Sequence, residues 1–343
     1  MPYLTAPEEL AGLLPGEPAF RARQLRRWLY LTPVLETDLM TDLPAALRRR
    51  IAPLWPFVVE EQQTADEGQT VKWLFRAPDG AAFESVLMGY PNRVTLCISS
   101  QAGCAMGCTF CATGQFGLDR HLHSGEIAAQ VAYARAYMGV SPLPGSPPRL
   151  GNVVFMGMGE PLANYENTRE AIRRLVEVMG ISARSITVST VGVVPGMRRL
   201  ADEPWPVTLA LSLHAADDDL RTRLVPLNRL YPIDDLVDAA AAFRRARGRR
   251  VTIEWALIGG VNDTPEQASA LASIARELRA HVNVIALNPT PLSPDRPPSE
   301  RAVGAFIERV AAGGATVTRR DTRGRGIDAA CGQLRARKGA PGR

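Results

Sequence analysis

The 343-residue sequence lacks the features of a membrane or secreted protein. It contains no run of eighteen apolar residues, the length that a membrane-spanning helix needs. It opens on Met1-Pro2-Tyr3, without the charged and then apolar stretch of a secretory leader. Its content of 46% apolar and 22% charged residues is that of an ordinary globular protein. From these absences we predict a cytoplasmic protein with no membrane partner.

Cysteine is scarce, and its placement is uneven. Four of the five cysteines fall within fifteen residues, and the last stands alone near the C-terminus. An odd number in a chain without a leader does not suit the disulfide framework of a secreted protein. The cysteines are therefore better interpreted as metal ligands or redox groups; they are Cys97, Cys104, Cys108, Cys111 and Cys331.

Lysine is almost absent, because only Lys72 and Lys338 occur among 40 Lys and Arg residues. The net charge is +5, yet residues 319–343 alone hold eight Lys or Arg against two Asp. A basic C-terminal tail, which we place at 321–343, suits a surface that binds RNA phosphates. A solvated chain end would have the same composition, so charge alone leaves both interpretations open.

Residues 1–56 predict a small N-terminal helical domain. Around Phe20–Tyr30, the spacing puts Phe20, Leu25, Trp28 and Leu29 near one helix face, with arginines opposite. A second helix opens at Leu43-Pro44 and ends in three arginines. The domain is either an RNA-binding module or a helical cap with solvated arginines.

Residues 57–90 alternate between apolar and polar positions around an Asp79-Gly80 turn, which predicts a small antiparallel β extension. From residue 91 onward, short β-rich runs alternate with helical stretches, as in parallel β/α units. Ser124 and Thr264 are expected N-caps of two of these helices. We predict an α/β fold with an open six-unit (β/α) partial TIM-type barrel at 91–320, between the N-terminal domain and the tail. The strands are expected at Val94–Ile98, Asn152–Met156, Ile186–Thr190, Val207–Leu213, Val251–Ile258 and Val282–Leu287, and the helices at Ser124–Met138, Tyr165–Met179, Pro232–Arg245 and Pro265–Arg279.

Polar and glycine-rich segments follow the predicted strands at their carboxyl ends. In a parallel barrel these ends converge on one rim, where active sites lie. We therefore expect one site built from several segments, which are Cys104–Cys111, Gly157–Pro161, Ser189, Ser212–His214 and Asn288-Pro289.

The spacing Cys104-x3-Cys108-x2-Cys111 offers three thiolates from one loop. Structural zinc sites and ordinary four-iron clusters usually take four protein ligands. Three ligands leave one iron open, as the binding of S-adenosylmethionine (SAM) through its amino and carboxylate groups requires. The alternative is a zinc site completed by His121, His123 or Cys97.

These motifs resemble the RlmN/Cfr family of radical SAM RNA methyltransferases, and within it the RlmN branch. The resemblance runs almost from end to end of the chain. It is carried by Cys97–Cys104, Cys108–Gly114, Gly157–Leu162, Leu209–Ala215, Ile258–Thr264 and the C-terminal stretch Thr322–Leu334.

The resemblance implies the roles of the site residues. Cys104, Cys108 and Cys111 would bind a [4Fe-4S] cluster whose open iron binds SAM. Cys331 would be the S-methylcysteine intermediate, and Cys97 the resolving cysteine that forms a transient disulfide with it. Glu84 would be the proton acceptor, although from the sequence alone it reads as a surface strand carboxylate. The implied SAM-binding residues are Gly159, Glu160, Ser189, Ser212, Leu213, His214 and Asn288.

The resemblance also implies an activity, methylation of carbon 2 of an adenosine in 23S rRNA and of the adenosine 3′ to the anticodon in tRNAs. Two SAM molecules would be used per turnover, through a covalent RNA adduct. A flavodoxin- or ferredoxin-type protein would supply electrons, and the enzyme would act as a monomer.

Two other functions stay open at this point. A Cfr-type enzyme shares the machinery and methylates carbon 8, but Gln101-Ala102-Gly103 and the N-terminal segment favour carbon 2. A metal-stabilised RNA-binding protein would need no SAM, and it leaves Cys97 and Cys331 without a role.

Overall fold

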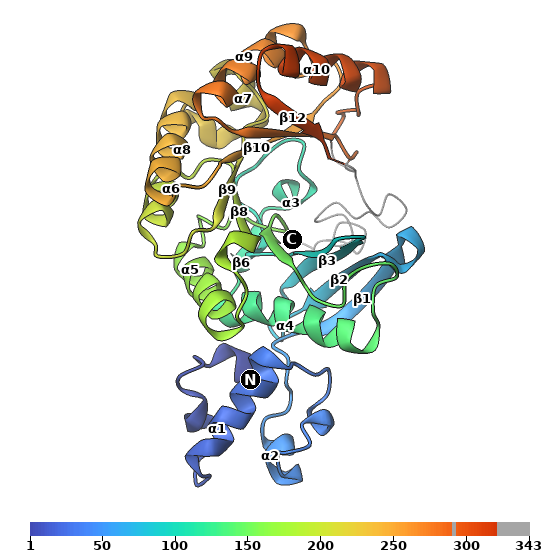
Figure 1. Cartoon of the computed structure of the whole chain (residues 1–343), viewed down its shortest axis with the longest axis vertical. Coiled ribbons are helices and arrows are strands. Elements are labelled where there is room, and N and C mark those ends of the chain that lie inside the picture. The colour runs from blue at the N-terminus through green and yellow to red at the C-terminus, as the bar shows by residue number, and fades with distance from the viewer. Residues whose placement is uncertain (290–292, 321–343) are drawn as a thin grey trace.

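The computed structural model describes residues 1–289 and 293–320, and one sheet of ten strands runs through most of them. The strand order is β1-β2-β3-β4-β7-β8-β9-β10-β11-β12, so the sheet follows the chain with one excursion between β4 and β7. In Figure 1 the helices follow one another around the outside of the curved sheet, and the N-terminal elements lie beneath α4 (Ser124–Val140).

The parallel part of the sheet confirms the predicted barrel. All six expected strands form, each within one residue of its predicted ends, and every neighbouring pair is parallel. A seventh parallel strand, β12, adds to them beside β11. It is short and largely exposed, so its sequence has little of the apolar pattern that reveals a buried strand. The strands are β4 (Arg93–Cys97), β7 (Asn152–Phe155), β8 (Ile186–Thr190), β9 (Thr208–Ser212), β10 (Thr252–Leu257), β11 (His281–Ala286) and β12 (Thr316–Arg319).

The connections are mostly helical. The four predicted helices form within two residues of their expected ends, if the π-helix η6 is counted as the last part of the second one, whereas α3 (Ala112–Gln115), α6, α7 and α10 were not predicted. Thr264 caps its helix as expected, but the N-cap of α4 is His123 and not Ser124. The imidazole accepts a hydrogen bond from the Gly125 N–H, and the Glu126 carboxylate accepts one from the His123 N–H. The helices after α4 are α5 (Tyr165–Arg173), α6 (Val194–Asp202), α7 (Asp218–Leu224), α8 (Ile233–Arg247), α9 (Pro265–Glu277) and α10 (Glu300–Ala312), with the π-helix η6 (Arg174–Val178) after α5 and the 3-10 helices η7 (Ala183–Ser185) and η8 (Pro226–Arg229).

The predicted β extension is antiparallel, and it continues the barrel sheet. Its strands are β1 (Val58–Ala65), β2 (Thr70–Arg76) and β3 (Ala82–Tyr90), with the 3-10 helix η5 (Asp66–Gly68) between the first two. The turn between β2 and β3 contains the expected Gly80, in a left-handed conformation. Because β3 also pairs with β4, residues on β2 and β3 lie inside a large sheet.

The N-terminal segment is helical, as predicted, but one of its expected buried residues is exposed. Leu25 and Leu29 are buried and Trp28 is half-buried, whereas Phe20 is 43% exposed. At 3.6 residues per turn, Phe20 lies about 140° around the helix from Leu25, and therefore faces away from the core. The elements are η1 (Pro2–Leu4), η2 (Leu10–Leu13), α1 (Ala19–Arg26), η3 (Arg27–Leu31), η4 (Thr37–Leu39) and α2 (Ala45–Arg50).

The N-terminal segment shares a hydrophobic core with the barrel. Tyr3 is fully buried and stacks on Trp55, which in turn packs edge-on against Tyr133 of α4. The Arg174 guanidinium donates a hydrogen bond to the Tyr3 carbonyl and thereby fastens η1 to η6. Within residues 1–289 and 293–320, no helix is long and apolar enough to cross a membrane.

Candidate active site

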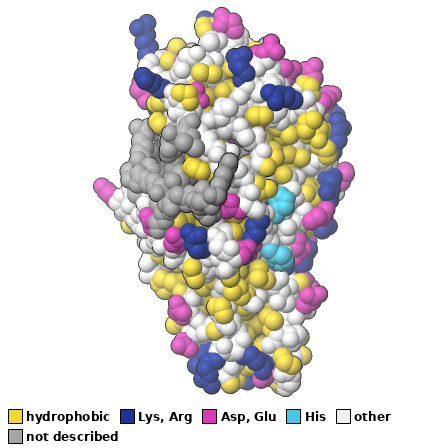
Figure 2. All heavy atoms as spheres, turned by 180° about the vertical axis from the view of Figure 1, so that it is seen from behind, with side chains coloured by type: hydrophobic (Ala, Val, Ile, Leu, Met, Phe, Trp, Pro, Cys, Tyr) yellow, Lys and Arg dark blue, Asp and Glu magenta, His cyan; other side chains and the backbone are white. Residues whose placement is uncertain are grey.

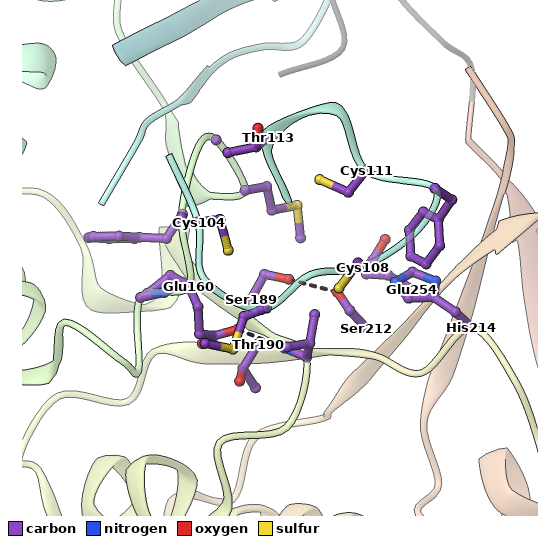
Figure 3. Close-up of a pocket in the computed structure, with 18 of the residues that line it drawn as sticks. Cys104, Cys108, Cys111, Thr113, Glu160, Ser189, Thr190, Ser212, His214 and Glu254 are labelled. Carbon is purple, nitrogen blue, oxygen red and sulfur yellow. Dashed lines mark hydrogen bonds between the residues drawn. The ribbon is translucent and has the colours of Figure 1, made fainter. Parts of the chain in front are cut away.

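A cavity of about 220 Å³ opens at the carboxyl ends of the barrel strands. Its walls are the cysteine loop, the segment after β7, the ends of β8 and β9, and inward-facing side chains of β10 and β11. Figure 3 shows Cys104, Cys108 and Cys111 together with Glu160 and Ser189 around one space. Four of the five predicted strand-end segments therefore contribute to one cavity, while Asn288-Pro289 is not among its lining residues.

The cysteine loop leaves the sheet after β4 and is held by a small hairpin, β5 (Gln101–Gly103) with β6 (Leu118–His121). Gly103 has φ +82°, and a Cβ there would overlap the Gly117 carbonyl, so the first cysteine follows a position that needs glycine. The Cys104 N–H donates to that same carbonyl at 2.8 Å. Cys111 begins the one-turn helix α3 (Ala112–Gln115), and its N–H donates to the Cys108 carbonyl at 3.2 Å.

The three thiols lie around the same cavity; Cys104 and Cys108 are buried, and Cys111 is half-buried. Burial raises the pKa of Cys104 to about 12 and that of Cys108 well above its ordinary value, and the neighbouring thiols add to both shifts. A thiol must lose its proton to bind a metal, so cations have to supply the driving force for ionisation here. Raised pKa values do not suit free catalytic thiolates, and a role as metal ligands stays the prediction for these thiols.

The ligands that would complete a zinc site have other partners. The Nδ1 atom of His121 lies 2.9 Å from the Gln101 amide, and His123 caps α4. Cys97 packs with Val86 and Val154 on the inner face of the sheet. In the described part of the chain, no three His, Cys, Asp or Glu side chains converge closely enough to hold a single ion.

The segment after β7 approaches the cysteine loop so closely that only glycine fits at two positions. A Cβ at Gly157 would lie 2.5 Å from the Ile98 carbonyl oxygen. Gly159 has φ +99°, and its Cβ would lie 2.8 Å from the Gln101 backbone nitrogen. The Gln101 side-chain oxygen accepts a hydrogen bond from the Glu160 N–H at 2.8 Å. The position of Glu160 therefore depends on this tight contact.

Glu160 is a buried carboxylate at the floor of the cavity. Its two oxygens accept hydrogen bonds from the backbone N–H groups of Leu162 at 3.0 Å and Val191 at 2.9 Å. Burial raises its pKa to about 7, while these N–H donors act in the opposite direction. Each carboxylate oxygen has a second lone pair, so the group can still accept hydrogen bonds from an amine in the cavity.

The ends of β8 and β9 contribute hydroxyls and an imidazole. The Oγ atoms of Ser189 and Ser212 lie 3.1 Å apart and both line the cavity. His214 has φ +62°, a strained conformation for a residue with a side chain. Its Nδ1 accepts a hydrogen bond from the Ala256 N–H, and burial lowers its pKa to about 3. The neutral ring therefore carries its proton on Nε2 and can donate it to a ligand.

Two predicted SAM-binding residues are placed differently from the others. The Leu213 side chain is fully buried in the main hydrophobic core. Its N–H donates to the Glu254 carbonyl, and its own carbonyl accepts from Arg221. Asn288 lies two residues beyond the end of β11 and is half-buried. Both roles stay predictions.

The three predicted catalytic residues fall in different places. Cys97 ends β4, and its register partner on β3 is Val86. Glu84 lies two residues from Val86 on the same face and is fully buried, so the interpretation as a surface carboxylate is wrong. The Glu84 carboxylate forms an ion pair with Lys72, with Nζ 3.0 Å from Oε2. Cys331 lies outside the described residues, as does the whole tail at 321–343.

The sequence did not reveal Glu254 and Arg320, which also line the cavity. Glu254 is 4% exposed and accepts a hydrogen bond from Asn283 at 2.8 Å and from Arg320 at 3.2 Å. Glu254 could have been found from the sequence, because it is a carboxylate in the middle of a β-rich run. Charged groups are rarely buried without a partner, so a charge at such a position indicates a paired or functional group. Arg320 is the last described residue before the tail, and its presence at the cavity had no local sequence signal.

Two family models match the chain. The radical SAM superfamily model matches residues 98–272, which include the cysteine loop and most of the cavity. The ribosomal RNA large subunit methyltransferase N-terminal domain matches residues 13–55.

Curated relatives match over nearly the whole chain. A probable dual-specificity RNA methyltransferase RlmN of Salinispora tropica is 51% identical over 331 residues, which cover 94% of this chain and 89% of that protein. One of the same name from Chloroflexus aurantiacus is 49% identical, covering 97% of this chain and 92% of that protein. A radical SAM methyltransferase structure from Sphaerobacter thermophilus superposes with a TM-score of 0.90 at 47% identity, covering 96% of this chain and 98% of that one.

Proposed function

Because the chain belongs to the RlmN family of dual-specificity RNA methyltransferases, in the radical SAM superfamily, we propose that it methylates carbon 2 of adenosine in two kinds of RNA. The proposed substrates are an adenosine of 23S rRNA and the adenosine 3′ to the anticodon in tRNAs. The observation that carries the proposal is the common cavity of Cys104, Cys108, Cys111 and Glu160.

The cysteine loop fits a [4Fe-4S] cluster. It offers three thiols, two of them buried, on one side of a cavity whose other walls carry hydrogen-bonding groups suited to SAM. When bound, the cluster supplies the electron that splits one SAM into methionine and a 5′-deoxyadenosyl radical, which takes a hydrogen atom from an S-methyl group. We infer that a flavodoxin- or ferredoxin-type protein supplies that electron, because a one-electron donor is needed. Such donors and the RNA substrates suit a cytoplasmic enzyme.

The polar residues of the cavity would hold SAM. Glu160 would accept hydrogen bonds from its amine, for which an ionised carboxylate is required. The hydroxyls of Ser189 and Ser212 would donate to its carboxylate or ribose, and the neutral His214 would donate from Nε2. We also propose that Gly159, Leu213 and Asn288 contribute to SAM binding.

Cys331 would carry the carbon that is transferred. Its thiolate first takes a methyl group from SAM, with S-adenosylhomocysteine as the leaving group. Arg320 supports this role, since it lines the cavity and stands eleven residues before Cys331. An extended chain of that length reaches at most about 40 Å, so the thiol can reach the cavity.

Glu84 and Cys97 would complete the reaction once the methylene carbon of Cys331 is joined to carbon 2 of the adenine. Glu84 removes the proton from that carbon: the C–H bond breaks, an O–H bond forms, and the electron pair stays on the ring. The unpaired electron that radical addition leaves on the ring passes to a one-electron acceptor, such as the oxidised form of the flavodoxin- or ferredoxin-type protein, so that the adduct becomes a closed-shell species. The Cys97 thiolate then attacks the Cys331 sulfur, so that an S–S bond forms as the S–C bond breaks. The electron pair goes to the carbon, which takes up a proton as the methylated RNA leaves. An external reductant restores the two thiols.

The exposed arginines of the N-terminal elements support RNA binding by that segment. Arg23, Arg26, Arg27, Arg49 and Arg50 are all exposed. Figure 2 shows Lys and Arg side chains gathered at the end of the molecule that these elements form. Exposed arginines bind phosphates through paired hydrogen bonds, in a salt-dependent way.

The test of the reaction is mass spectrometry of nucleosides after anaerobic turnover with 23S rRNA fragments and tRNA. We expect 2-methyladenosine, which chromatography separates from 8-methyladenosine. The carbon-8 product would assign the chain to Cfr-type chemistry, and an absence of methylated nucleoside from fully loaded enzyme would refute the proposal.

Two cysteine variants test the order of steps. The C97A variant should accumulate RNA bound through Cys331, because the adduct forms before Cys97 is needed. The C331A variant should form neither adduct nor product. A denaturing gel with labelled RNA distinguishes them. Normal turnover by C97A, or crosslinking by C331A, contradicts the assigned roles.

A further inference from the structure

Lys72 and Glu84 form an ion pair in the interior of the protein. They lie on neighbouring antiparallel strands, β2 and β3, with the lysine Nζ 3.0 Å from the carboxylate Oε2. Both side chains are 0% exposed. The register pairs Lys72 with Val86 and Glu84 with Leu74, so the two charged residues are diagonal neighbours on one face.

Stability alone is a poor reason for such a pair. Removing two charges from water costs several kcal/mol per ion, and apolar residues of similar volume often stabilise a core equally well or better. Leu74, the register partner of Glu84, is buried and apolar, so this part of the sheet accommodates apolar side chains. A pair of buried charges therefore points to a chemical use.

The cation of this pair is a lysine in a chain that almost never uses lysine. Only Lys72 and Lys338 occur among 40 Lys and Arg residues. Arginine is a wide planar fork, whereas lysine places a compact positive charge at the end of a narrow chain. A compact ammonium can lie against one carboxylate oxygen inside a closed strand interface.

The ion pair lies on the same face of the sheet as Cys97, the proposed resolving cysteine. Lys72 is the register partner of Val86 on one side, and Cys97 is the register partner of Val86 on the other. Lys72, Val86 and Cys97 therefore form a row across three strands, with Glu84 next to that row. Val86 and Cys97 pack directly against each other. The ion pair thus shares the face of the sheet on which the adduct would be cleaved.

We propose that Lys72 is a positioning residue for Glu84, which keeps its carboxylate ionised and fixed for proton removal from the tethered adenine. The inference rests on the proposed function of Glu84. A carboxylate buried without a cation favours its neutral form, which cannot accept a proton. The ammonium stabilises the anion and donates a hydrogen bond to Oε2, so the carboxylate keeps one orientation. When the adenine proton arrives, an O–H bond forms on Glu84 and Lys72 keeps its charge.

The test compares K72M with E84Q in enzyme loaded with cluster and SAM. Met has a similar length and no charge. Both variants should methylate Cys331 and cleave SAM within about twofold of the wild type, but accumulate an RNA adduct that added thiol does not release. General-base assistance contributes about 100- to 10,000-fold, and we expect K72M to slow product release by at least about tenfold. K72R keeps the charge in a wider group and should release product faster than K72M and slower than the wild type.

The R174M variant is the matched control. Arg174 is 2% exposed and pairs with Glu170, so its loss also removes a buried cation, but one on η6 and not on the β extension. It should lower the thermal midpoint and form no persistent adduct. If E84Q releases RNA normally, the proton-acceptor role itself fails. If E84Q retains RNA while K72M releases it at the wild-type rate, only the role of Lys72 fails. Loss of SAM cleavage in both K72M and K72R would show a merely structural role, and that result also overturns the proposal.

Discussion

Replacement of Gly159 by alanine should disable SAM binding through a contact that does not touch SAM. The backbone there has φ +99°, which costs a residue with a side chain about 1–3 kcal/mol. The new Cβ would also lie 2.7 Å from the Gln101 Cγ and 2.8 Å from its backbone nitrogen. Backbone cannot rotate aside, so this overlap adds about 1–3 kcal/mol.

The overlap should propagate to Glu160. The Gln101 Oε1 atom accepts a hydrogen bond from the Glu160 backbone nitrogen at 2.8 Å. A shift of Gln101 breaks this hydrogen bond and thereby moves the Glu160 carboxylate. The displaced carboxylate would lose a hydrogen bond to the amine of SAM. Loss of one hydrogen bond to a charged group costs about 1.5–3 kcal/mol, so we expect SAM affinity to fall about 10- to 150-fold. Equilibrium dialysis with labelled SAM on cluster-loaded protein measures this change, and iron content shows whether the cluster is retained.

The G180A variant separates backbone strain from the overlap. Gly180 has φ +69°, and no atom lies within 4 Å of the point that an alanine Cβ would occupy, so alanine there is strained but meets no neighbour. It should lose about 1–2 kcal/mol of stability and bind SAM normally. If G159A binds SAM within twofold of the wild type, or unfolds at the same denaturant concentration as G180A, the tight contact does not position Glu160.

Two further predictions concern the cysteine loop and the cap of α4. Replacing any one of Cys104, Cys108 or Cys111 by alanine should abolish the brown iron–sulfur absorption and reductive SAM cleavage; a triple-alanine variant that still cleaves SAM would contradict this. Burial, with help from Arg174, lowers the pKa of His123, so its neutral cap stabilises the fold above pH about 6.5 and is lost as the pH falls through the lower folded value. From pH 7.5 to 5, the wild type should therefore lose about 1 kcal/mol relative to H123N. Equal losses in a pH series of thermal melts would show that His123 does not act as this cap.

The sequence predicted the barrel well because its strands are buried and its helices have clear starts. Val153, Val188 and Leu209 belong to short β-rich runs separated by helical stretches, and that alternation has few structural solutions. The cysteine loop was equally visible, since three cysteines in one loop have few other uses. The N-cap of α4 was misplaced by one residue because histidine is an uncommon cap, whereas the adjacent serine is a favoured one.

The environment of Glu84 could not be predicted, because it depends on the strands at both sides of β3. In the sequence, residues 57–90 look like a separate hairpin unit, in which a carboxylate can face water. In the structure β3 lies between β2 and β4 of a ten-stranded sheet, and Glu84 is enclosed. Likewise, the contact between Glu254 and Arg320 joins residues that are 66 positions apart. The sequence around each residue gives no indication that the other is its partner.

Under the proposed mechanism, the β extension contributes to the chemistry and does not merely cover the barrel. The proposed SAM-binding residues lie at the strand ends, and all except Asn288 fall within residues 98–272, which the superfamily model matches. The proposed proton removal and adduct cleavage use Glu84 and Cys97, which are buried side chains on one face of the sheet. By pairing β3 with β4, the chain extends the inner face of the barrel beyond its first parallel strand, so that Lys72 and Glu84 share a face with Cys97. A chain with the barrel alone would keep Cys97 on β4 and lose Lys72 and Glu84, the pair proposed for proton removal.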